Sequence, residues 1–192
     1  MALLITPPFA LSYISAYGMP GESPVPWLAA LRDPLLEAGL LSGSPVRTYD
    51  RYGVLYLGAW VLALGGLAGL VRQRWEQTGR HLRRAWIGVI GALGVVALGI
   101  AGDYAVPDEV DRGVGFLLTN VGFLGVMVAF PLLGWALRLE HRAHRVIAWG
   151  VGLLGPAAMI GGLLLVGHIP SGPGAGLALA SLMTAACWGT RT

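Results

Sequence analysis

The sequence predicts an all-α protein, a polytopic membrane helical bundle with five clear transmembrane helices and a marginal sixth at the N-terminus. Of its 192 residues, 55% are hydrophobic and 12% are charged, whereas roughly 25% are charged in an ordinary soluble domain. Several uninterrupted apolar runs also reach the ~17 to 25 residues that a helix needs to cross a bilayer. We therefore expect residues 1–192 to form a single integral membrane domain.

The charged residues and the cysteine narrow the class further. The formal charge of +3 comes from arginines that flank the apolar runs and do not form a basic face, so we expect no nucleic-acid partner. The single cysteine, Cys187, excludes an internal disulfide and a multi-cysteine metal site. The sequence carries no cofactor signature, and we expect no bound cofactor.

The N-terminal part begins with the marginal span, residues 1–17, which has the pair Pro7 and Pro8 in its middle and barely the length to cross. Residues 18–51 form an outer segment that is too rich in proline to span. An amphipathic piece of this segment predicts a short helix, which lies in the membrane interface or packs over the mouth of the bundle. Its apolar positions at near-helical spacing are Trp27, Leu28, Leu31, Leu35 and Leu36.

The first two clear spans are expected at residues 54–71 and 86–102, and both contain glycines that favour close helix packing. The loop between them, residues 72–84, is strongly basic. The connection after the second span is acidic, so the two loops are expected on opposite sides of the membrane. The carboxylates of this acidic loop are Asp103, Asp108, Glu109 and Asp111.

The third span, residues 113–137, has the most internal order. One side of the expected helix carries a line of residues at steps of four and three, namely Phe116, Asn120, Phe123, Met127 and Phe130. Another side is nearly free of side chains and suits a closely packed neighbour, with Gly115, Gly122, Gly125 and Ala129. A helix with two specialised faces is expected at the centre of the bundle.

The last two spans are expected at residues 146–167 and 174–188, with a kink near Pro156. Under the positive-inside rule, the loops 72–84 and 138–145 lie on the cytoplasmic side of the plasma membrane. Their arginines would attract anionic lipid headgroups of the inner leaflet, at about 1 kcal/mol each. These arginines are Arg72, Arg74, Arg80, Arg83, Arg84, Arg138, Arg142 and Arg145.

Five residues are candidates for a polar or ligand contact. Asn120 is expected to point into the bundle, between Phe116 and Phe123, and to bond to another span or to a ligand. Asp103 and His168 end their spans on the outer side and could form an acid/base pair there. The sequence contains no catalytic signature, and the spacing of the acidic loop fits no metal site.

These features favour a non-enzymatic accessory subunit or membrane scaffold, whose partners are the bilayer and other membrane helices on its glycine-rich faces. The alternative is a small transporter, or a protein that handles a lipid or another apolar ligand in a groove beside Asn120. A membrane-embedded enzyme with an outward-facing site is the third reading. A packed helix around Asn120 would favour the scaffold and a lined cavity the transporter, whereas convergence of Asp103 with His168 would favour the enzyme.

Overall fold

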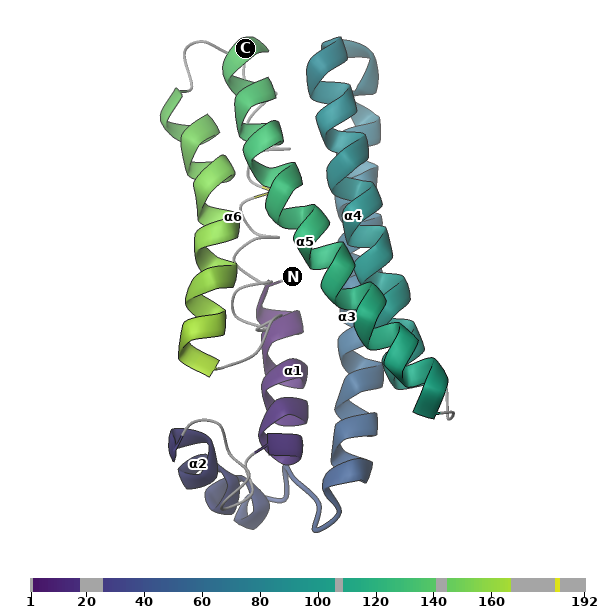
Figure 1. Cartoon of the computed structure of the whole chain (residues 1–192), viewed down its shortest axis with the longest axis vertical. Coiled ribbons are helices and arrows are strands. Elements are labelled where there is room, and N and C mark those ends of the chain that lie inside the picture. Colours follow the sequence, from purple (N-terminus) through teal and green to yellow (C-terminus); the bar gives the residue numbers. More distant parts are fainter. Residues whose placement is uncertain (1, 18–25, 106–108, 141–144, 167–181, 184–192) are drawn as a thin grey trace.

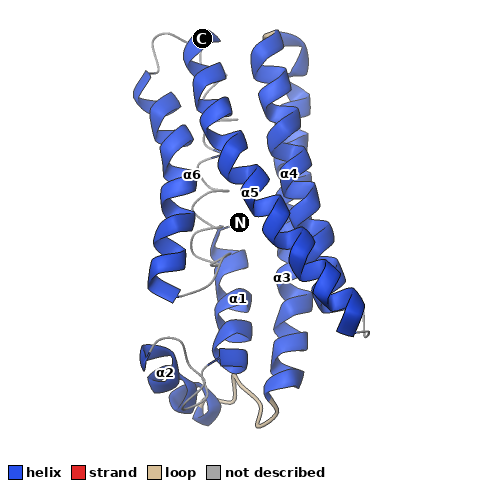
Figure 2. Cartoon of the chain, viewed as in Figure 1, coloured by secondary structure: helices blue, strands red, loops and turns tan. Residues whose placement is uncertain are grey.

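The chain is an assembly of helices in a computed structural model, which describes residues 2–17, 26–105, 109–140, 145–166 and 182–183 (Figures 1 and 2). Within these ranges every secondary-structure element is a helix, so the all-α prediction is confirmed for them. The elements are α1 (Ala2–Tyr17), α2 (Pro26–Glu37), α3 (Pro45–Gln73), the short 3-10 turn η1 (Trp75–Gln77), α4 (Arg80–Ala105), α5 (Glu109–Glu140) and α6 (Arg145–Val166).

Three of the described helices are long and apolar enough to cross a membrane. The segments are Asp50–Gln73 in α3, Arg80–Tyr104 in α4 and Gly113–Leu139 in α5. They contain the spans expected at 54–71, 86–102 and 113–137. The helix expected at 146–167 is present as α6, which is helical through Pro156. The span expected at 174–188 lies outside the described residues except at 182–183.

The helices α3 and α4 are antiparallel neighbours, and α5 crosses them obliquely (Figure 1). The first half of α5 packs against α4, and its second half packs against α6. The helix α1 lies against α3. The helix α2 contacts α1 and lies at the end of the bundle where α3 begins (Figure 1). With 16 residues α1 is about 24 Å long at ~1.5 Å per residue, which is short of a hydrocarbon core ~30 Å thick.

The contact between α4 and α5 is made by backbone. A Cβ atom added to Gly115 would lie 2.8 Å from the carbonyl oxygen of Gly99, and one added to Gly99 would lie 2.7 Å from that of Gly115. About two turns further along α5, a Cβ on Gly122 would lie 2.7 Å from the backbone nitrogen of Val96. No side chain fits at these distances. The predicted packing strip of the third span is therefore confirmed, and its neighbour is α4.

The connection from α2 to α3 is ordered by local hydrogen bonds. Gly39 has a φ of 70°, and the N–H groups of Gly39 and Leu40 donate to the carbonyls of Leu36 and Leu35, both at 3.0 Å. This is the Schellman end of a helix, in which glycine adopts the left-handed conformation without steric penalty. Leu28 of α2 is buried, so the short predicted helix is anchored to the bundle on one side.

The line of residues on α5 is a buried seam only in its inner part. Phe123 and Phe130 are 2% and 0% exposed, whereas Phe116 is 44% exposed. A line with steps of four and three repeats every 3.5 residues, so it drifts around a helix that has ~3.6 residues per turn. In addition, α5 exchanges one neighbour for another halfway along, so the seam cannot face a single helix over its whole length.

Candidate functional sites

Four of the residues predicted from sequence, Asp103, Phe116, Asn120 and Phe123, lie in the described helices α4 and α5. The Asn120 amide nitrogen donates to the backbone carbonyl of Phe116 at 2.8 Å, and Asn120 is half-buried. Among the described residues, Asn120 therefore bonds to its own helix and not, as expected, to another span. The carbonyl four residues earlier on the same helix is within reach of a short amide side chain, so the amide finds an acceptor without a partner helix.

Asp103 lies at the end of α4, where its backbone packs directly on Gly115 of α5. The next residue, Tyr104, lays its ring over Gly53 of α3 and meets the Tyr56 ring edge-on at 6.4 Å. The proposed acid/base partner, His168, lies outside the described residues. Asp103 is thus placed by close helix packing at the junction of α3, α4 and α5.

Aromatic rings from four helices fill the interior beside these residues. Phe9 of α1 lies 5.3 Å from Tyr56 of α3, and Trp60 of α3 lies 6.0 Å from Phe123 of α5, between ring centroids. Tyr56 and Trp60 are 2% and 1% exposed. The surroundings of the inner part of the seam are therefore packed.

Two polar atoms inside this aromatic core have no hydrogen-bond partner among the described residues, the Tyr56 hydroxyl and the Trp60 Nε1. They belong to adjacent turns of α3 and lie near one another without reaching hydrogen-bond geometry. Each unsatisfied buried group costs about 1 to 3 kcal/mol. Ser15 of the neighbouring helix α1 is buried and donates a hydrogen bond to the Ser12 carbonyl at 2.8 Å.

Potential metal ligands do not gather in the described part of the chain. No group of three or more histidine, cysteine, aspartate or glutamate side chains lies close enough there to hold an ion. Of the acidic loop, Asp108 falls outside the described residues.

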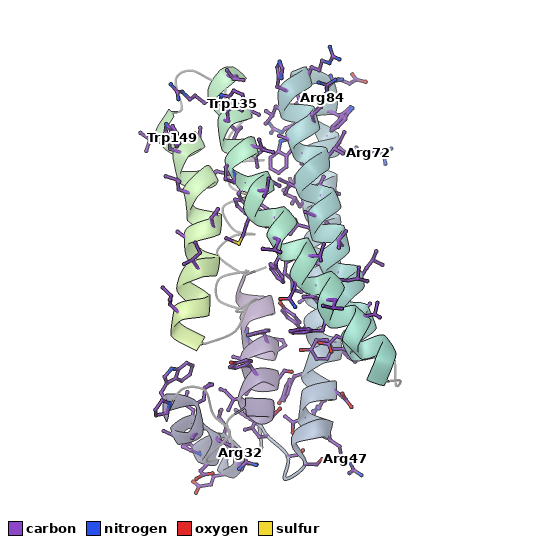
Figure 3. The ribbon with its side chains drawn as sticks, viewed as in Figure 1. Arg32, Arg47, Arg72, Arg84, Trp135 and Trp149 are labelled. Atoms are coloured by element: carbon purple, nitrogen blue, oxygen red, sulfur yellow. The ribbon has the colours of Figure 1, made fainter. Side chains whose placement is uncertain are left out.

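The other end of the bundle carries a groove between α5 and α6. Its volume is about 240 Å³. The floor forms where Gly134 meets α6, because a Cβ on Gly134 would lie 2.5 Å from the Ala148 carbonyl oxygen and 2.9 Å from the Gly152 Cα. The walls are two tryptophans, Trp135 and Trp149, which are 61% and 54% exposed. Figure 3 shows both tryptophans near the same end of the bundle.

Arg138 is the one charged residue among the described residues that line the groove. Arg138 follows Gly134 by one helical turn, and its guanidinium lies 5.8 Å from the centre of the Trp149 ring. This is the distance of a cation–π contact. No described carboxylate lies within 4.0 Å of this guanidinium. The one ion pair of that length among all the described residues joins Arg32 and Asp33. The groove therefore combines an apolar slot with a guanidinium that has no ion-pair partner among the described side chains.

A second groove at the same end lies between α3 and α4. It is wider, about 520 Å³, and more open. Arg72 and Trp75 line it together with the apolar side chains Val71, Ile87 and Ile90. The Trp75 ring is engaged by Arg83, whose guanidinium lies 5.5 Å from the ring centre. Arginine beside tryptophan thus occurs on both sides of the bundle at this end.

The sequence analysis pointed to some residues of the groove between α5 and α6 but did not predict the groove itself. Arg138 was expected as part of the basic loop 138–145, and Trp135 and Trp149 flank that loop in the sequence, where tryptophan typically anchors a helix at the membrane interface. The signal that was missed is the spacing of Gly134, Trp135 and Arg138, which puts a small residue and a cation one turn apart on one side of a helix. No protein-family model matches the chain, and no curated protein and no solved structure shows significant similarity to it.

Proposed function

We propose that the chain is a non-enzymatic membrane scaffold that assembles with a second copy of itself through an exposed glycine face of α3. This face consists of Gly58, Gly65 and Gly69, whose spacing of seven and four residues places them along one side of the helix. A Cβ atom added to any of the three would meet nothing within 4 Å. This open face of a membrane-spanning helix is the observation that carries the proposal.

The way in which glycine is used elsewhere in the chain supports it. Where Gly99 and Gly115 face each other, two helices come into backbone contact. Gly65 and Gly69 have the small-xxx-small spacing that allows the same approach between separate membrane helices. A second α3 is the partner proposed because one self-complementary face closes into a twofold dimer without leaving an unpaired surface. The packed surroundings of Phe123 also favour a scaffold over a transporter.

Cysteine crosslinking in bilayer vesicles tests the dimer. In a full-length Cys187→Ser background, Leu62→Cys places a thiol between Gly58 and Gly65, and oxidation is expected to give a crosslinked dimer. Adding Gly65→Leu should abolish the crosslink, since a branched side chain separates the helices. Leu124→Cys on α5 is the matched control, because Leu62 and Leu124 are both 62% exposed. Equal crosslinking of the two cysteine variants, or none, contradicts the proposal.

The same proposal includes the full topology, with five spans and a marginal sixth in a plasma membrane and the loops 72–84 and 138–145 on the cytoplasmic side. The positions of Arg72 and Arg84 at the same end as Trp135 and Trp149 support this parity (Figure 3). A membrane-impermeant thiol reagent applied to intact cells should label Ser42→Cys but not Gln77→Cys, again with Cys187 replaced by serine. The reverse labelling pattern would invert the orientation.

Handling of a lipid or another apolar ligand is a second candidate function. It is favoured by the groove between α5 and α6, with its apolar walls and one cation. The groove expected beside Asn120 is a different place, and there Phe123 is packed against Trp60 at 6.0 Å. Mass spectrometry of lipids that stay bound through detergent purification would test this candidate.

A further inference from the structure

The groove between α5 and α6 has the size and lining of a site for one hydrocarbon chain. Its volume of about 240 Å³ exceeds the roughly 150 Å³ of an apolar cavity that holds benzene and falls below the roughly 300 Å³ of a pocket for a drug-sized ligand. The groove is open to the outside of the bundle, since the tryptophan side chains that wall it are more than half exposed. A ligand can therefore enter from the side, out of the bilayer.

The chemistry at the mouth of the groove selects the headgroup. Arg138 lies near the end of the apolar segment Gly113–Leu139, so in an α5 that spans the bilayer it would reach the level where acyl chains give way to phosphate groups. Its guanidinium is exposed, and no described carboxylate lies within 4.0 Å of it. Its contact with the Trp149 ring, at 5.8 Å, orients the group without neutralising its charge. A planar guanidinium pairs with phosphate through two parallel hydrogen bonds.

We propose that the groove between α5 and α6 is a binding site for an anionic phospholipid, with one acyl chain between Trp135 and Trp149 and the headgroup phosphate on Arg138. Tryptophan suits this position because its ring is apolar while its N–H reaches the headgroup layer. The floor at Gly134 and Gly152 contributes a smooth backbone surface on which a methylene chain can lie. This inference gives the lipid-handling candidate its ligand class and does not depend on the α3 dimer.

Quenching of tryptophan fluorescence by brominated lipid tests the site in the full-length protein. The protein is reconstituted in phosphatidylcholine vesicles that contain a small fraction of either phosphatidylglycerol or phosphatidylcholine brominated in the acyl chain. The chain has seven tryptophans, so the signal of the groove is obtained as the difference from the Trp135→Phe, Trp149→Phe double variant. We expect brominated phosphatidylglycerol to quench this difference signal about fivefold more effectively, the factor that corresponds to about 1 kcal/mol.

Two variants separate a built site from diffuse attraction to a basic end. Arg138→Gln should abolish the preference for phosphatidylglycerol. Arg72→Gln removes the same charge at the same end but from the groove between α3 and α4, so it should leave the preference unchanged. Leu153→Phe, at an exposed position of the groove lining, should lower quenching by both lipids because the larger ring fills part of the slot without adding a tryptophan signal.

The outcomes that overturn the inference are distinct. An equal loss of preference in Arg138→Gln and Arg72→Gln would show that only the summed charge of this end acts. Equal quenching by the two brominated lipids would show that the groove holds any acyl chain, which overturns the headgroup assignment and leaves lipid handling intact. Quenching no greater than that of the remaining tryptophans would overturn both.

Discussion

The sharpest test of the structure is an alanine at Gly115, where α4 and α5 come into backbone contact. The added Cβ would lie 2.8 Å from the Gly99 carbonyl oxygen and would also collide with the backbone at Gly102 and Asp103. Backbone atoms of a packed helix cannot rotate away as a side chain would, so the two helices must separate. Overpacking of this kind costs about 1 to 3 kcal/mol, and three backbone contacts at one site place it near ~3 kcal/mol. The gain in helix propensity from glycine to alanine offsets at most about 1 kcal/mol.

The net expectation for Gly115→Ala is therefore a loss of about 2 kcal/mol in the free energy of unfolding, measured by titrating the protein from mild detergent into dodecyl sulfate while following circular dichroism and tryptophan fluorescence. Gly113→Ala, two residues earlier on the same helix, is the control, because a Cβ at Gly113 would meet nothing within 4 Å. It should be neutral or more stable by up to ~1 kcal/mol. If the two variants unfold at the same dodecyl sulfate fraction, the close approach of α4 and α5 is refuted.

Three further predictions concern the polar groups. Asn120→Leu should cost less than ~0.6 kcal/mol in the same titration, the mean of measured interhelical bonds, because among the described residues its amide bonds to its own helix; a loss above ~1.7 kcal/mol would reveal an interhelical partner. Tyr56→Phe should raise the free energy of unfolding by about 1 kcal/mol, since it removes a buried hydroxyl that has no partner among the described residues; destabilisation would show that the hydroxyl is satisfied. Calcium or zinc should leave the thermal midpoint of the purified protein unchanged. A saturable stabilisation at micromolar metal that is lost in an Asp108→Asn, Asp111→Asn variant would contradict this.

The sequence predicted the helices better than it predicted their ends. The core of each of the first three clear spans lies inside an observed helix, because uninterrupted apolar runs leave few alternatives in a membrane. The start of α3 was placed too late. Pro45 belongs to the segment 18–51 that was expected to be too rich in proline to span, whereas it stands at the first position of α3, where proline is well tolerated since its missing N–H would have had no partner in the helix.

The sequence could describe faces of α5 but not assign neighbours to them. The glycine strip predicted a close neighbour, and that prediction is confirmed with α4. The aromatic line was expected along one side of the helix, but its burial could not be deduced from the spacing, since Phe116 is exposed whereas Phe123 and Phe130 are buried. The groove at Gly134 depends on where α6 crosses α5, which is a property of two segments at once and cannot be deduced from the periodicity of either one.

The length of α5 ties the shape of the bundle to the membrane around it. Its apolar segment has 27 residues and so extends about 40 Å at ~1.5 Å per residue, whereas the hydrocarbon core of a typical bilayer is ~30 Å thick. A segment that is too long for its bilayer inclines, as α5 does relative to α3 and α4 (Figure 1). Kinking of the helix or local thickening of the bilayer can accommodate the same excess length. Because α5 contacts α4 with its first half and α6 with its second half, any change in its tilt would have to be shared with both neighbours.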